Sequence, residues 1–74
     1  MKTIVDRPYQ NDYPEIVDWL LENIGNKTAP WKGHPWAAEG WDAWHTNVGK
    51  PSHIVLRVTF DRSENAALFA VRWL

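Results

Sequence analysis

The clearest pattern of hydrophobic and polar positions lies between residues 53 and 60. Even-numbered positions there are apolar and odd-numbered positions are mixed, and the apolar set is Ile54, Leu56, Val58 and Phe60. A period of two predicts a strand with one face in the core. Residues 40–46 alternate more weakly, with Trp41 and Ala43 on one face, and residues 47–51 supply turn chemistry. The sequence therefore predicts an antiparallel hairpin over about 40–60.

Residues 12–24 show a helical pattern of apolar positions. Apolar side chains recur there at the spacing of one helix face, at Tyr13, Ile16, Val17, Leu20, Leu21 and Ile24. Asp12 and Glu15 have the spacing of a capping box, and Gly25 suits the position that follows a helix. These features predict a helix over 12–24. We expect its Leu20 and Ile24 to be buried with Leu56, Val58 and Phe69.

The two ends of the chain complete the expected fold. Thr3-Ile4-Val5 is a β-branched run followed by Pro8, which predicts a short N-terminal strand. The last segment fits a strand by its alternation, but Asp61 and Glu64 repeat the capping spacing and its alanines favour a helix. We therefore predict a helix over about 62–73. The fold class is α+β, in a single domain over residues 1–74.

Between the first helix and the hairpin lies a segment rich in tryptophan. Residues 26–39 contain turn-forming asparagine, proline and glycine, and the span from Trp31 to Trp44 holds four of the six tryptophans. Loops of this length in compact domains are often functional. The tryptophans either cover the core of a very small domain or form a binding surface, and the sequence leaves both interpretations open.

Composition narrows the function classes. The net charge of −1 argues against a general nucleic-acid-binding protein, which would be basic. No stretch approaches the length of a membrane span, and we expect no signal peptide and no membrane partner. The absence of cysteine fits a cytoplasmic location. Residues 1–25 are acidic and the middle of the chain is mildly basic.

Catalytic chemistry has little support in the sequence. No phosphate-binding loop, cysteine nucleophile or activated serine is found, and the first helix carries its carboxylates on the solvent side. The three histidines match no zinc signature. We therefore expect a protein that is not an enzyme and that has no cofactor and no metal.

Trp19 stands apart from the other residues of the first helix. It falls outside the apolar face, near Glu15 and Glu22, so either the following loop covers it or it is an exposed anchor ringed by acids. Because the loop begins at the end of this helix, its tryptophans can reach the same side. The predicted binding residues are Trp19, Glu15, Glu22, Trp31, Lys32 and Trp36.

Both ends and the centre of the chain resemble small uncharacterised proteins of tailed bacteriophages. The resemblance rests on Asp12-Tyr13-Pro14-Glu15, Trp19-Leu20, Gly40-Trp41-Asp42, Phe60-Asp61, Glu64-Asn65-Ala66, Leu68-Phe69 and Arg72-Trp73. It covers about half of the chain and implies no activity, but small phage proteins without catalytic motifs commonly bind, and sometimes inhibit, a host protein.

Three functions remain open at this point. The first is a small binding protein that contacts a host protein in the cytoplasm of the host cell. The second is a single-stranded nucleic-acid binder that stacks bases on Trp31 and Trp36 and meets phosphate with Lys32. The third is a structural or self-associating protein. The oligomeric state does not follow from the sequence.

Overall fold

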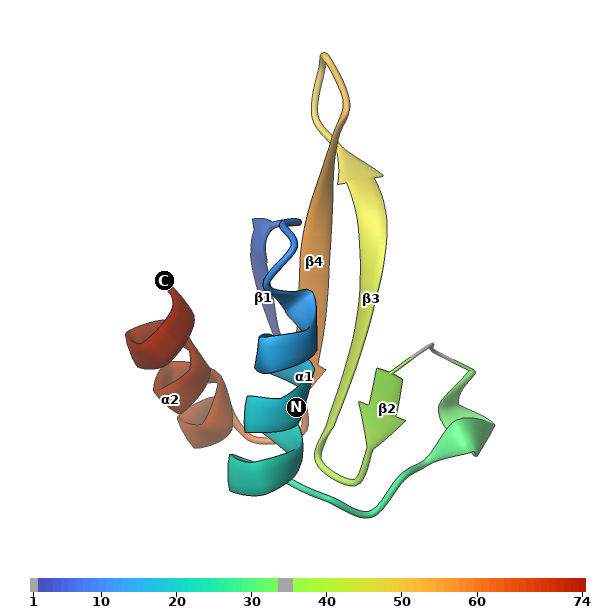
Figure 1. The fold of residues 1–74 in the computed structure, drawn as a ribbon, viewed down its shortest axis with the longest axis vertical. Helices are drawn as coiled ribbons and strands as arrows, with labels where there is room; N and C mark the ends of the chain where they lie inside the picture. The colour runs from blue at the N-terminus through green and yellow to red at the C-terminus, as the bar shows by residue number, and fades with distance from the viewer. Residues whose placement is uncertain (1, 34–35) are drawn as a thin grey trace.

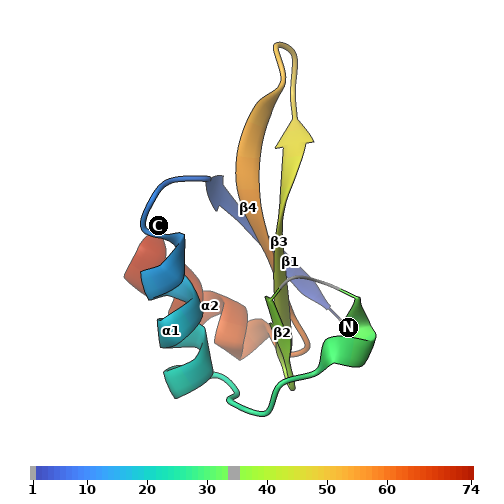
Figure 2. The same cartoon turned by 45° about the vertical axis from the view of Figure 1, so that its right-hand side comes forward.

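The computed structural model describes residues 2–33 and 36–74, and it has the predicted α+β class. A four-stranded antiparallel sheet carries two helices on one of its faces (Figures 1 and 2). The elements in chain order are β1 (Thr3–Pro8), α1 (Tyr13–Asn23), the 3₁₀ helix η1 (Pro30–Lys32), β2 (Trp36–Ala38), β3 (Trp41–Val48), β4 (His53–Phe60) and α2 (Ser63–Trp73). The N-terminal strand, the first helix, the hairpin and the C-terminal helix are all confirmed.

The sheet order is β1-β4-β3-β2, so the N-terminal strand pairs with the second arm of the hairpin. The register places Val5 and Ala43 on either side of Val58, and Trp41 opposite Phe60. Because side chains alternate between faces, these residues share one face of the sheet. The predicted facing of Trp41 and Ala43 in β3 is therefore confirmed.

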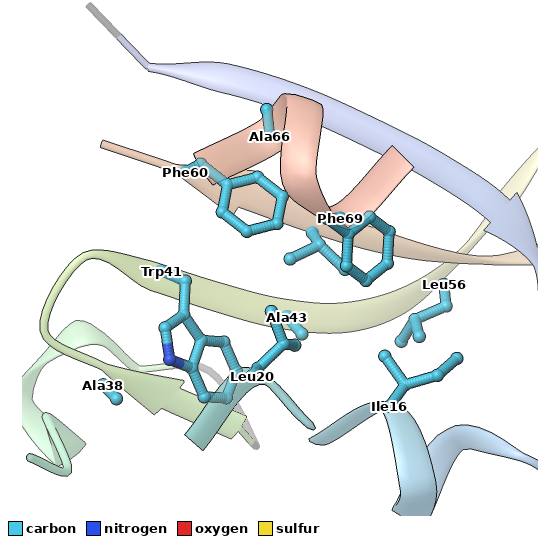
Figure 3. Packing of buried hydrophobic residues seen from close by; sticks show 10 residues of the cluster. Ile16, Leu20, Ala38, Trp41, Ala43, Leu56, Phe60, Ala66 and Phe69 are labelled. Carbon is cyan, nitrogen blue, oxygen red and sulfur yellow. The ribbon is translucent and has the colours of Figure 1, made fainter. Parts of the chain in front are cut away.

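This face and the two helices enclose the core (Figure 3). The largest fully buried side chains are Trp41, Phe60, Phe69, Ile16, Leu20, Leu56 and Val58. Phe60 of β4 meets Phe69 of α2 with ring centroids 5.4 Å apart, so aromatic packing holds α2 on the sheet. Of Leu20, Ile24, Leu56, Val58 and Phe69, which we expected to be buried together, Ile24 alone is incompletely buried, because it lies at the end of α1.

Two parts of the hairpin differ from the prediction. β3 extends to Val48, and the arms project beyond the helices as a long ribbon (Figures 1 and 2). Ile54 lies on the apolar face of β4 but is 49% exposed, because neither helix reaches this part of the ribbon. The strict alternation of β4 thus predicted the face of Ile54 correctly and its burial wrongly.

The segment 26–39, which we expected to be a loop, contains η1 and β2. β2 is short and pairs with the first residues of β3, with Trp36 opposite Ala43. Ala29 is fully buried, and its N–H donates to the carbonyl of Ala37 at 3.0 Å. The segment is therefore an ordered edge of the sheet in its described part, while His34 and Pro35 lie outside the described residues.

Neither predicted capping box forms. Asp12 precedes α1, but its carboxylate accepts a hydrogen bond from Arg7 Nη1 at 2.9 Å instead of capping the helix. α2 begins one residue later than the capping spacing implies, and Arg62 in extended conformation precedes it without a side-chain cap. An ion pair to a neighbouring strand outcompetes the local cap at Asp12, which sequence spacing cannot reveal.

Candidate functional site

An open groove lies between the two helices and is lined by residues of both. The residues that line it are Glu15, Asp18, Trp19, Glu22, Arg72 and Trp73. Its volume is about 260 Å³. We call these six residues the helix groove. It joins three predicted binding residues of α1 to the C-terminal turn of α2.

Two tryptophans form the aromatic part of the helix groove. Trp19 is half-buried and meets Phe69 edge to face, with ring centroids 6.1 Å apart. Trp73 is half-buried as well, and the guanidinium carbon of Arg72 lies 4.2 Å from the centre of its ring. Helix α2, and not the loop, therefore supplies the partial cover over Trp19. The off-face position of Trp19 is explained by a second helix beside the first.

The carboxylates of the helix groove form one row along α1. Glu15, Asp18 and Glu22 are separated by three and four residues, so they lie on one stripe of the helix. All three are exposed, and none forms an ion pair with a described residue. The single cation of the groove, Arg72, stacks on Trp73 and forms no ion pair with them. Three negative charges thus face one positive charge.

The predicted loop residues lie elsewhere. Trp31 is 71% exposed on η1, which lies on the other side of the sheet from the helices (Figure 2). Trp36 faces the helix side but packs on Tyr13 at 5.0 Å between centroids, near the beginning of α1. Neither loop tryptophan lines the helix groove with Trp19. The structure brings together Trp19, Glu15 and Glu22 only.

Lys32 has a structural role in this arrangement. Its ammonium group donates to the carbonyl of Ala38 at 2.8 Å and reaches the carbonyl of Trp41 at 3.4 Å. These two carbonyls flank the turn between β2 and β3, so the side chain ties η1 to the sheet. An ammonium that is engaged in this way is poorly placed to meet a phosphate group.

The face of the sheet opposite the helices carries a separate polar pair at its centre. Arg57 donates two hydrogen bonds of 2.9 Å to the carboxylate of Asp6, one strand away. The hydrogen bond and the charge of Asp6 raise the pKa of Arg57 above its usual value. This cation is already neutralised by a bidentate partner, so it offers no free positive site on that face.

Sequence reasoning missed three residues of the helix groove. Asp18 could have been found, because it lies between Glu15 and Glu22 on the same helical stripe. Arg72 and Trp73 could not, because only the packing of α2 beside α1 brings them to the site. No group of His, Cys, Asp or Glu side chains suited to a metal ion occurs within residues 2–33 and 36–74. Nor is any described helix long and apolar enough to cross a membrane.

The helix groove thus combines two indole rings, a row of carboxylates that form no ion pair with a described residue, and one stacked guanidinium. Comparison of the chain with protein-family models, with curated proteins and with solved structures gave no match.

Proposed function

We propose that the protein is a small, non-enzymatic binding protein that docks onto another protein through the helix groove. The observation that carries this proposal is the position of Trp19 and Trp73 beside three carboxylates that have no ionic partner among the described residues. Protein interfaces commonly combine an aromatic anchor, which supplies affinity, with a charged rim, which steers the partner.

The size of the helix groove favours a macromolecular partner. Its volume of about 260 Å³ lies below the range of roughly 300–1,000 Å³ for clefts that enclose drug-sized ligands. The groove is also open to solvent, so it suits side chains that project from a larger surface.

Glu15 lies in the first turn of α1, where a negative charge suits the helix dipole, but Glu22 does not serve the stability of the helix, and this supports a role in binding. Glu22 lies in the last turn, where a negative charge opposes the helix dipole, and that turn carries no basic residue. Carboxylates three and four residues apart also repel one another. A positively charged partner would relieve both effects.

The resemblance to small proteins of tailed bacteriophages extends this proposal. On that basis the chain is phage-encoded, its partner is a protein of the host cytoplasm, and binding inhibits that partner. The mode of action requires only that the docked protein cover a surface that its partner uses.

The proposal is tested by capture from a host lysate with a tagged protein. The variant Glu15→Gln/Asp18→Asn/Glu22→Gln removes the charges of the helix groove and keeps the side-chain sizes. We expect it to weaken capture of the partner by about tenfold or more while it stays folded, because the charged rim of an interface governs association.

A matched control carries the same loss of charge away from the groove. The variant Glu39→Gln/Asp61→Asn/Glu64→Gln alters three exposed carboxylates elsewhere. It should capture the partner as well as the unchanged protein does. If both variants capture the partner equally, the contact surface lies outside the helix groove and the proposal fails.

A further inference from the structure

One guanidinium group of the protein itself, that of Arg72, already lies in the helix groove. Arg72 places its guanidinium carbon 4.2 Å from the ring centre of Trp73, which is a close cation–π stack. The other indole of the groove, Trp19, has no cationic group over its ring among the described residues. The carboxylate row beside it forms no ion pair with any residue that the structure describes. One half of the groove is therefore occupied by a guanidinium, and the other half is not.

We infer that the partner segment is an arginine-bearing one, whose guanidinium group takes the unoccupied half of the helix groove. The group lies against Trp19 and donates hydrogen bonds to the carboxylate row of Glu15, Asp18 and Glu22. This inference rests on the proposed function and adds the chemistry of the partner. Charge complementarity supports the inference, because the groove has three carboxylates and one arginine, and this arginine is stacked on Trp73.

Arginine fits this arrangement better than lysine for a geometric reason. The guanidinium group is planar, so it can lie flat on an indole while its N–H groups donate in the plane to carboxylates. A lysine ammonium is a compact, strongly hydrated charge that gains less from the aromatic surface. Since the groove offers an indole and carboxylates together, it discriminates between the two cations.

The spacing of the carboxylates also indicates the form of the segment. Glu15 and Glu22 are seven residues apart, which corresponds to about 10 Å along a helix. A helical segment with arginines at positions i, i+3 and i+7 presents cations at the same intervals. It can lie along the groove and meet each carboxylate in turn.

The test uses the full-length protein and three synthetic helical peptides that differ only at these positions. They carry arginine, lysine or citrulline, which keeps the shape of arginine without its charge. Binding is measured by calorimetry, and the indole N–H signals of Trp19 and Trp73 are followed by NMR. We expect the arginine peptide to bind at least about tenfold more tightly than the citrulline peptide, because three charges are lost and the loss of a single charge-assisted hydrogen bond already has about this effect.

The lysine peptide should bind several-fold more weakly than the arginine peptide, and Trp19 should shift most. The Glu15→Gln/Asp18→Asn/Glu22→Gln variant should lose the preference for arginine, and the Glu39→Gln/Asp61→Asn/Glu64→Gln control should keep it. Equal binding of the arginine and lysine peptides, or of the arginine and citrulline peptides, overturns the inference. So does binding that leaves the Trp19 signal unchanged.

These outcomes separate the inference from the proposed function. If the arginine peptide does not bind but lysate capture still depends on the three carboxylates, the docking surface is correct and its arginine chemistry is wrong. If the three peptides differ in affinity as expected but the charge variant of the groove does not change capture from lysate, the binding chemistry is correct and the proposed function is wrong.

Discussion

Gly25 shows how one residue can fix the path of the chain after a helix. Its carbonyl accepts a hydrogen bond of 2.9 Å from the indole nitrogen of Trp41, which is 1% exposed. A Cβ atom at this position would run into the backbone carbonyl of Glu39. Glycine is therefore required here by close approach of two backbones, in addition to its suitability after a helix.

We expect Gly25→Ala to destabilise the protein by roughly 1–3 kcal/mol, the usual cost of forcing extra atoms into a packed site. Thermal denaturation followed by circular dichroism measures the effect. Asn26→Ala, at the exposed neighbouring position, is the control and should change stability by no more than about 0.5 kcal/mol. Equal melting temperatures for the two variants would show that Glu39 does not approach Gly25 in solution.

The burial of individual tryptophans could not be predicted from residue type alone. Trp41 is buried, Trp31 is 71% exposed, and Trp19, Trp36 and Trp73 are half-buried. An indole packs equally well in a core or at an interface, so residue type does not separate these cases. Alternation placed Trp41 on the same face as Ala43, but its burial follows only from the helices that cover this face. Trp31 and Trp36 follow no such period, and their positions depend on η1 and β2.

At the scale of elements, an ion pair joins β1 to the beginning of α1. Arg7 Nη1 donates to Asp12 at 2.9 Å, and the two side chains are only 11% and 29% exposed. The guanidinium carbon of Arg7 also lies 5.9 Å from the ring centre of Trp73. A strand, the first helix and the end of the second helix thus meet at one arginine.

Asp12→Ala is expected to cost about 1–3 kcal/mol, because it leaves a largely buried donor of Arg7 without its acceptor. A double-mutant cycle with Arg7→Ala, measured by chemical denaturation, isolates the pair. We expect a coupling free energy of at least about 0.5 kcal/mol between the two positions. Additive effects would mean that Asp12 acts on α1 alone, as a local cap does.

Elements with a strong local period could be predicted, and those fixed by tertiary contacts could not. The helix at 12–24 and the strand at 53–60 repeat their apolar positions over several turns or pleats, so their type followed from the chain itself. β2 has three residues and is a strand because it pairs with β3. No hydrophobic pattern within these three residues predicts it. The helix groove forms only because α1 and α2 lie side by side. From the sequence, only residues of α1 could be predicted to belong to it.

For the whole molecule, the sheet lies between Trp19 and the exposed loop tryptophan Trp31, which the sequence analysis placed in one binding surface. Both helices cover one face, and η1 with Trp31 lies across the sheet from them (Figure 2). The acidic row therefore belongs to one surface and the exposed loop tryptophan to another. This arrangement leaves Trp31 without an aromatic partner among the described residues, and with Lys32 turned toward the sheet.

The distribution of charge over the molecule predicts that single-stranded nucleic acid does not bind. The net charge is −1, Lys32 donates to two backbone carbonyls, and Arg57 is held by Asp6. Phosphate contacts are strongest at low salt, so a fluorescent oligothymidylate in low-salt buffer gives the most sensitive test. We expect no change in its fluorescence anisotropy at protein concentrations that saturate the protein partner.

The matched variant for this experiment is Trp31→Ala, which should fold normally because Trp31 is 71% exposed. Binding that weakens steeply with added salt and disappears in Trp31→Ala would support the nucleic-acid interpretation, because base stacking on an exposed indole contributes about 1–3 kcal/mol per base. Binding that Trp31→Ala leaves intact would place the nucleic acid elsewhere on the protein. The absence of binding in both proteins leaves Trp31 outside any nucleic-acid site and is consistent with docking through the opposite surface, where Trp19 lies beside its carboxylates.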